Sequence, residues 1–199
     1  MGVVFPSTIR RICSPYDEPS VRVVIIGLDS AGKTTLVQRF KNLVDLQIDT
    51  HASFIESITT EPTFVYQIET VSPRLSPVAF NLWDLGGQEK TRELWRFYLT
   101  GIQGVVFVID CHDEQRIKLA RKELLDLSKK LGRSSTIPVV IAANKQDLPE
   151  SLRKEELIEA LSLPKIESKE WKIFEISAHS GGGVMEMFSY LSQFIHNNQ

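Results

Sequence analysis

The residues most clearly arranged for chemistry form the run Gly-Leu-Asp-Ser-Ala-Gly-Lys-Thr at 27–34. The spacing Gly-x-x-x-x-Gly-Lys-Thr is typical of a phosphate-binding loop, in which backbone N–H groups and the start of the next helix surround the anion. Lys33 is expected to contact the β- and γ-phosphates, and the Thr34 hydroxyl is expected to bind Mg²⁺. The predicted phosphate-loop residues are Gly27, Leu28, Asp29, Ser30, Ala31, Gly32, Lys33, Thr34 and Thr35.

A second motif indicates which base accompanies the phosphates. The apolar run 139–143 ends in Asn144, Lys145, Gln146 and Asp147. The Asp147 carboxylate can accept hydrogen bonds from N1–H and the exocyclic amino group of guanine, whereas adenine would leave this acceptor unpaired. Asn144 is expected to tie this loop to the phosphate loop, and the stem of Lys145 to lie along the base. The motif therefore predicts a guanine nucleotide.

A third motif, Asp84-Leu85-Gly86-Gly87-Gln88, follows a strand-like run. A carboxylate at the end of a strand suits Mg²⁺ held through a water, which makes Asp84 a predicted metal ligand. Gly87 can bring its N–H against a γ-phosphate where a side chain would obstruct. Gln88 can orient an attacking water, so Gln88 and Lys33 are the predicted catalytic residues.

Together these motifs resemble the Ras superfamily and, within it, the Arf and Arf-like family of small GTPases, over about residues 21–195. The resemblance also includes Trp-Asp-Leu-Gly-Gly-Gln-Glu-Lys at 83–90, Leu-Trp-Arg at 94–96 and Ala-Asn-Lys-Gln-Asp-Leu-Pro at 143–149. It implies that Thr63 is a second hydroxyl ligand of Mg²⁺. It further implies that a backbone N–H in the run Ser177, Ala178 and His179 meets the base carbonyl, and that effectors contact Tyr66, Trp83 and Tyr98.

The resemblance implies a switch that hydrolyses GTP to GDP slowly, because no arginine can be assigned as an internal catalytic finger. The expected partners are a nucleotide exchange factor, a GTPase-activating protein and GTP-dependent effectors. The expected place is the cytoplasm, with reversible binding to the cytosolic face of the Golgi or another endomembrane, and the expected role is membrane or vesicle traffic. Two alternatives are a guanine-nucleotide-binding scaffold without hydrolysis and a nucleoside or nucleotide kinase.

Composition agrees with one globular domain, since 199 residues with 42% hydrophobic side chains suffice for a sizeable core. The net charge of −2 indicates no nucleic-acid partner. Two cysteines imply no disulfide framework, and no apolar run is long enough for a transmembrane helix. We expect a monomer.

The alternation of strand-like and helix-like runs predicts an α/β fold with buried parallel strands. The resemblance implies its Ras-like, phosphate-loop form, with a mostly parallel six-stranded sheet and helices on both faces. The predicted strands are 21–26, 63–70, 78–84, 104–110, 138–144 and 171–176. The predicted helices are 33–43, 113–131, 153–161 and 183–196. The predicted domains are an N-terminal membrane-interacting segment, 1–20, and a small GTPase domain, 21–199.

The stretch 36–65 is the first of two regions that depart from the family pattern, and the N-terminus is the second. Val65 stands where the family usually has glycine, which predicts a different active conformation of this segment. The stretch 36–61 is also longer than usual, and the extra residues lie near 44–57. Such an insertion is either a solvated loop or a partner-selecting one.

The N-terminal residues 2–13 form a candidate interfacial helix, because Phe5, Ile9 and Ile12 share one face at helical spacing. The myristoylation pattern on Gly2 is incomplete, since Pro6 occupies the Ser or Thr position. Gly2 and Cys13 are candidate lipidation sites. No prenylation motif ends the chain, so any anchor is expected at the N-terminus.

Overall fold

A computed structural model of the chain describes residues 20–48, 58, 60–74, 76–132, 135–166 and 170–198. The strands are β1 (Ser20–Gly27), β2 (Tyr66–Val71), β3 (Ala79–Leu85), β4 (Gly104–Asp110), β5 (Val139–Asn144) and β6 (Trp171–Glu175). The α-helices are α1 (Lys33–Ile48), α2 (Glu89–Arg92), α3 (Trp95–Tyr98), α4 (Ile117–Leu131), α5 (Lys154–Ala160) and α6 (Val184–Asn197). Two 3₁₀ turns are η1 (Glu114–Arg116) and η2 (Leu163–Lys165).

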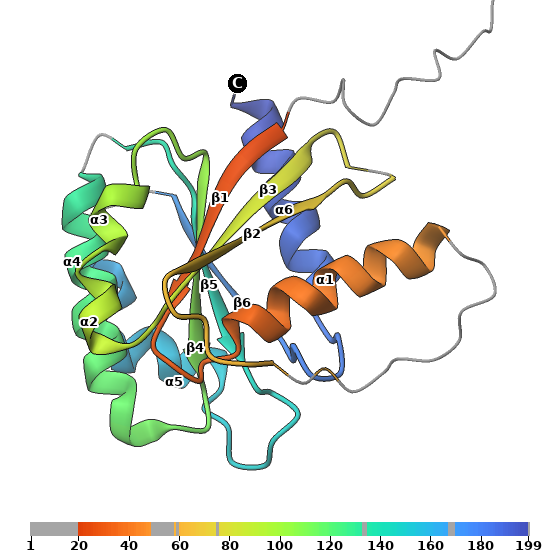
Figure 1. Ribbon diagram of the computed structural model, residues 1–199. Coiled ribbons are helices and arrows are strands. Elements are labelled where there is room, and N and C mark those ends of the chain that lie inside the picture. Colours follow the sequence, from red (N-terminus) through yellow and green to blue (C-terminus); the bar gives the residue numbers. More distant parts are fainter. Residues whose placement is uncertain are drawn as a thin grey trace, which may run out of the picture.

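The strands form one sheet in the order β2-β3-β1-β4-β5-β6. β2 is antiparallel to β3, and the other pairs are parallel. β4 and β5 are buried along almost their whole length, as expected for parallel strands covered on both faces. Because β1, β3 and β5 run in the same direction, the motifs that follow them meet at one edge of the sheet (Figure 1).

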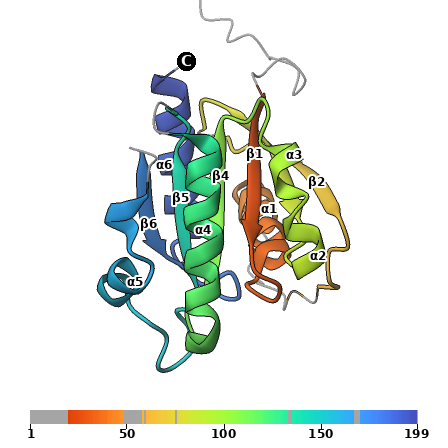
Figure 2. The same cartoon turned by 90° about the vertical axis from the view of Figure 1, so that its left-hand side faces the viewer.

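Helices cover both faces of the sheet. α1 and α6 pack on one face, and α4 lies on the other with α2, α3 and α5 (Figures 1 and 2). Each face has its own apolar core, one centred on Phe40, Phe80 and Phe188 and the other on Phe107 and Leu124. The apolar stripe of α4 faces the second core and consists of Ile117, Ala120, Leu124 and Leu127, with Leu131 partly buried beside them. The predicted α/β fold is therefore confirmed.

Element boundaries differ from the prediction at the segment before β2. The predicted strand 63–70 begins only at Tyr66, because Thr63 turns its hydroxyl toward the start of α1 and the end of β3. The Val65 carbonyl accepts a hydrogen bond of 2.9 Å from the Gly86 N–H. Residues 63–65 therefore contact the start of α1 and the end of β3 before the chain enters the sheet at Tyr66.

α1 extends to Ile48, past the predicted end at residue 43. Val44 packs in the core with 3% of its surface exposed, so the first part of the predicted insertion belongs to the helix. Residues 49–57 lie outside the described residues, as do residues 1–19 with Gly2 and Cys13. The boundary between segment 1–20 and the domain stays a prediction. Within the described part of the chain, no helix combines the length and apolarity needed to cross a membrane.

Candidate functional site

A cavity of about 430 Å³ opens at the edge of the sheet where β1 and β3 end. It is lined by Asp29, Ser30, Gly32, Lys33, Thr34, Thr35, Thr60, Glu61, Pro62, Thr63, Gly87, Gln88 and Lys145. Most of the predicted phosphate loop lines this cavity, hence named the phosphate cavity, while Gly27, Leu28 and Ala31 are buried nearby. A Cβ at Gly32 would collide with the side-chain amide of Asn144, so the loop tolerates only glycine there.

The Lys33 side chain bonds back to the backbone of the predicted phosphate loop. Its Nζ donates a hydrogen bond of 2.7 Å to the Leu28 carbonyl, and only 6% of the residue is exposed. Burial lowers the pKa of the Lys33 ammonium group to about 8, although the carboxylates of Asp84 and Asp29 partly offset this effect. A bound phosphate would favour the charged form further.

Three oxygen-bearing side chains meet beside Lys33. The Thr34 hydroxyl donates to Asp84 Oδ2 at 2.5 Å, and the Thr63 hydroxyl lies 2.8 Å from the Thr34 hydroxyl. Asp84 is 1% exposed, and its Oδ1 is buried without a hydrogen-bond partner. Burial raises the pKa of the Asp84 carboxyl group, while the hydrogen bond from Thr34 and the charge of Lys33 oppose the rise. Two hydroxyls and a carboxylate with an unpartnered oxygen fit a hard cation such as Mg²⁺.

The glycine pair after β3 packs against the phosphate loop. A Cβ at Gly87 would lie 2.5 Å from the Gly27 carbonyl oxygen and the Asp29 nitrogen. Glycine is thus required by the loop itself, in addition to any approach to a phosphate. Gln88 follows on the cavity wall with an exposed side chain.

Two side chains hold this glycine pair in place. Trp95 Nε1 donates to the Gly86 carbonyl at 2.9 Å. Arg92 donates to the Gly87 carbonyl at 3.2 Å and pairs with Glu123 of α4 at 3.3 Å. The short helices α2 and α3 therefore position the segment that carries Gln88.

Asn144 links the residues predicted to bind the base to the predicted phosphate loop. Its Nδ2 donates to the Ala31 carbonyl at 2.8 Å, and its Oδ1 accepts from the Ala178 N–H at 2.9 Å. Ser177 Oγ donates to Asp147 Oδ1 at 2.6 Å. The structure thus brings Asn144, Asp147, Ser177 and Ala178 together beside the phosphate cavity. His179 follows with an exposed side chain.

Lys145 lies on the wall of the phosphate cavity and pairs with Asp110, which was not among the predicted site residues. Its Nζ contacts Asp110 Oδ2 at 2.6 Å, and its backbone is in the left-handed region with φ of 69°. Asp110 ends β4 at the same edge of the sheet as the other motifs. Its place at the carboxyl end of a buried strand was the signal that could have found it.

Further cavity residues were also missed. The cavity is also lined by the three residues just before Thr63, namely Thr60, Glu61 and Pro62. Their closeness to Thr63 in the chain is the only sequence signal that indicates them. Arg116, the last residue of η1, pairs with the Asp29 carboxylate at 3.0 Å. No local pattern in the sequence distinguishes Arg116 from other surface arginines.

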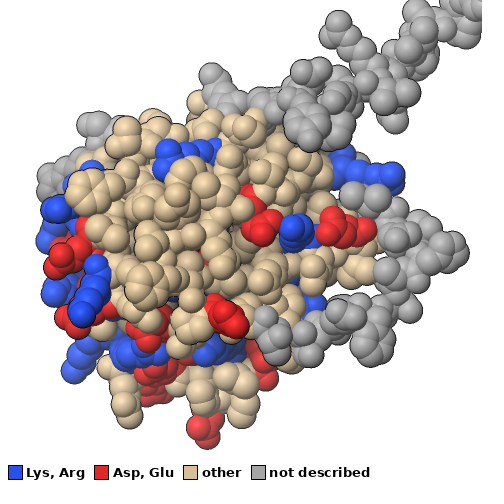
Figure 3. Space-filling view, viewed as in Figure 1, with Lys and Arg blue, Asp and Glu red and all other residues tan. Residues whose placement is uncertain are grey.

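The three residues predicted to face effectors form one aromatic cluster. The ring centroids of Tyr66 and Trp83 lie 5.5 Å apart, and that of Tyr98 is 5.6 Å from Tyr66. Phe64 and Phe97 nearby are 81% and 63% exposed. The face drawn in Figure 3 shows a broad area with few charged side chains over β2 and its neighbours. Such an area is typical of a protein-binding surface.

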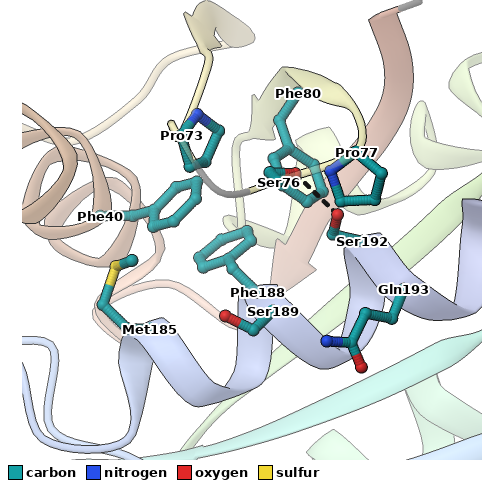
Figure 4. Close-up of a pocket in the computed structure, with 10 residues that line it drawn as sticks. All are labelled: Phe40, Pro73, Ser76, Pro77, Phe80, Met185, Phe188, Ser189, Ser192 and Gln193. Atoms are coloured by element: carbon teal, nitrogen blue, oxygen red, sulfur yellow. Dashed lines mark hydrogen bonds between the residues drawn. The ribbon is translucent and has the colours of Figure 1, made fainter.

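A second, apolar pocket of about 130 Å³ lies between α1, α6 and the loop that joins β2 to β3 (Figure 4). The rings of Phe40, Phe80 and Phe188 line it, together with Pro73 and Pro77 of the loop. Figure 4 also shows the hydroxyls of Ser76 and Ser192, 2.7 Å apart, which join the loop to α6. This pocket is separate from the phosphate cavity.

The sequence pattern of the ADP-ribosylation factor family matches residues 11–195. The chain belongs to this family. A similar solved structure is the Arl6 BBS3 small GTPase from Trypanosoma brucei with bound nucleotide analogue GppNp. It has 30% sequence identity and a TM-score of 0.74, and the match covers 90% of this chain and 99% of that one. As an ADP-ribosylation factor family member, the protein is a small GTP-binding protein.

Proposed function

We propose that this ADP-ribosylation factor family protein is a Mg²⁺-dependent switch that hydrolyses GTP to GDP. The cluster of Thr34, Thr63 and Asp84 carries the proposal, because it combines one hydroxyl from the phosphate loop, one from the segment before β2 and a buried carboxylate. Such a set suits a Mg²⁺ ion that also binds nucleotide phosphates and neutralises charge there.

In the proposed reaction, some residues bind the nucleotide phosphates and another orients the attacking water. Backbone N–H groups of the phosphate loop and the Lys33 ammonium group hold the β- and γ-phosphates. Gln88 orients a water for in-line attack on the γ-phosphorus, with GDP oxygen as the leaving group. In the described part of the chain Arg116 is engaged by Asp29 and Asp113, so we assign it no catalytic role. We therefore expect slow hydrolysis that an activating protein accelerates.

Val65 does not keep the segment before β2 away from the site. Its carbonyl bonds to Gly86, its φ is not positive, and Thr63 still reaches Asp84 at 3.2 Å. These contacts favour a hydrolysing switch over a nucleotide-binding scaffold without turnover.

Single-turnover hydrolysis of bound GTP, with and without candidate activating proteins, tests the proposal. We expect Gln88→Leu to bind GTP like the parent and to lose most of the stimulated rate. Gln193→Leu, an exposed glutamine on α6, is the matched control and should hydrolyse normally. Absence of turnover in the parent under every condition would instead support the scaffold.

We further propose that the aromatic cluster of Tyr66, Trp83 and Tyr98 contacts effectors in the GTP state, and that an exchange factor reloads the switch. Residues 2–13 would bind reversibly to the cytosolic face of an endomembrane, which would give the switch a role in membrane traffic. When these residues are not bound to a membrane, the apolar pocket of Figure 4 would bind them as an apolar helix. A pull-down with GTP-locked against GDP-locked protein would identify the effectors.

A further inference from the structure

Arg39 is a buried arginine that the proposed mechanism does not use. It lies within α1, is 2% exposed and is one of the largest fully buried side chains among the described residues. Its Nε donates to the Ala178 carbonyl at 3.1 Å, and its Nη2 donates to the His179 carbonyl. These carbonyls lie 139 and 140 residues further along the chain.

The side chain suits two adjacent carbonyls better than another residue type would. A guanidinium presents its N–H donors in a rigid planar fork, whereas a lysine has one compact ammonium group. Burial of a cation is costly unless it is hydrogen-bonded. The two carbonyls therefore stabilise the buried guanidinium of Arg39, and the guanidinium in turn holds the two carbonyls in place. Gly181 lies beside the stem, where a Cβ would be in ordinary van der Waals contact with Arg39 Cδ at 3.5 Å. Its φ of 93° is the feature that favours glycine.

The contact fixes the direction of a backbone N–H. In a trans peptide the C=O and N–H groups point in opposite directions, so an Ala178 carbonyl held by Arg39 sends the His179 N–H away from α1. Among the residues that the structure describes, this N–H has no acceptor. The Ala178 N–H, by contrast, is already bound to Asn144.

Other contacts hold the loop from its opposite side. Ser177 bonds to Asp147, and Ala178 bonds to Asn144, so the guanine-reading motif fixes one side of the loop while Arg39 fixes the other. Since α1 begins at Lys33, one helix connects the phosphate end of the site with the base end.

We propose that Arg39 is a positioning residue for guanine recognition, which aims the N–H of the Ala178–His179 peptide at the base carbonyl O6. The proposal rests on the guanine site proposed above. It predicts that Arg39 influences the contact with O6 and leaves the contact of Asp147 with the 2-amino group unchanged.

Three nucleotides distinguish the contact with O6 from the contact with the 2-amino group. GDP has both groups, 6-thio-GDP replaces O6 by sulfur, a weak acceptor, and inosine diphosphate lacks the 2-amino group. Dissociation constants are measured by titration in Mg²⁺ for the parent, Arg39→Met, Arg39→Lys and Phe40→Leu. Phe40 neighbours Arg39 on α1 but packs on Phe80 and Phe188, so Phe40→Leu controls for loss of helix packing.

The parent should prefer GDP to 6-thio-GDP by roughly tenfold, about the value of one hydrogen bond. Arg39→Met should reduce this preference to about twofold and keep the preference for GDP over inosine diphosphate. Arg39→Lys should fall between, and Phe40→Leu should retain both preferences. If Arg39→Met does not fold, Arg39→Lys carries the comparison.

If Arg39→Met weakened the binding of all three nucleotides equally, the positioning role would be overturned and a purely structural role would remain. The same conclusion would follow if the variant reduced both preferences together. No preference for GDP over either analogue in the parent would be a different result, since it would overturn the proposed guanine site as well.

Discussion

The hydroxyl oxygens of Thr34 and Thr63 lie 2.8 Å apart, although 29 residues separate them in the chain. Thr34 lies in the first turn of α1, and Thr63 precedes the edge strand β2. Asp84, at the end of β3, binds both. Three elements therefore converge where a cation and a γ-phosphate would be held, so we expect the position of the segment before β2 to depend on the bound nucleotide.

Thr63→Ala should weaken Mg²⁺ binding in the presence of a GTP analogue by roughly tenfold, since it removes one oxygen ligand and its hydrogen bond. Thr63→Ser keeps the hydroxyl and should behave like the parent. Release of fluorescent nucleotide measured across Mg²⁺ concentrations gives the affinity. Equal behaviour of the alanine and serine variants would remove Thr63 from the proposed metal site.

Removal of Mg²⁺ by a chelator should accelerate nucleotide release from the parent, because the phosphates lose their main counter-charge. Thr34→Asn should release nucleotide quickly even before the chelator is added. A release rate that does not depend on Mg²⁺ in the parent would contradict the proposed oxygen cluster.

Asp147→Asn should weaken GTP binding by tenfold or more, roughly the loss of one or two hydrogen bonds, and should favour xanthosine triphosphate. The reason is that an amide presents donors where the carboxylate presents acceptors, and xanthine has a carbonyl in place of the 2-amino group. Asp126→Asn on α4 is the matched control, since Asp126 forms an exposed ion pair with Lys129. Unchanged GTP affinity in Asp147→Asn would place Asp147 outside the base site.

Phe188→Ala should lower the free energy of unfolding by about 3–5 kcal/mol. Phe188 stacks on Phe40 with ring centroids 3.8 Å apart and meets Phe80 edge-on at 5.5 Å, so its loss opens a cavity under α1 and α6. Urea unfolding at fixed GDP and Mg²⁺ measures the change, because bound nucleotide adds to stability. Phe97→Ala, at a largely exposed ring, should change stability by less than about 0.5 kcal/mol.

Cys111 should resist thiol reagents in the folded protein. Burial raises the pKa of its thiol from 9.0 to about 12, which keeps the reactive thiolate scarce below pH 9. Because the unfolded chain ionises first, this thiol should destabilise the fold progressively from about pH 9 to about 12. In a Cys13→Ser variant, rapid labelling at pH 8 without denaturant would contradict this burial.

GTP-locked protein should sediment with anionic liposomes more than GDP-locked protein, if residues 2–13 bind membranes as proposed. Phe5→Ala/Ile9→Ala should reduce sedimentation, because each fully buried large apolar side chain contributes at most about 1.5–3 kcal/mol. Equal sedimentation of the two nucleotide states, or no loss in the double variant, would make residues 2–13 a plain leader segment.

Sequence alone determined the motifs and the fold class. The phosphate loop, the run that starts at Asp84 and the run that starts at Asn144 each consist of neighbouring residues whose spacing already carries their chemistry. The buried strands β4 and β5 were also predicted from sequence, since short, continuously apolar runs are typical of parallel strands covered on both faces. Helix ends and the start of β2 were less accurate, because tertiary contacts at Thr63 and Val44 decide them.

Only the tertiary structure decided which distant residues meet. Arg39 with the Ala178 and His179 carbonyls, and Arg116 with Asp29, are pairs that no local pattern indicates. The short helices α2 and α3 were also missed, since four residues are too few to show a helical period. The physical reason is common to these cases: a hydrogen bond or ion pair forms between groups that the sheet order and helix packing bring together, and sequence spacing does not encode that order.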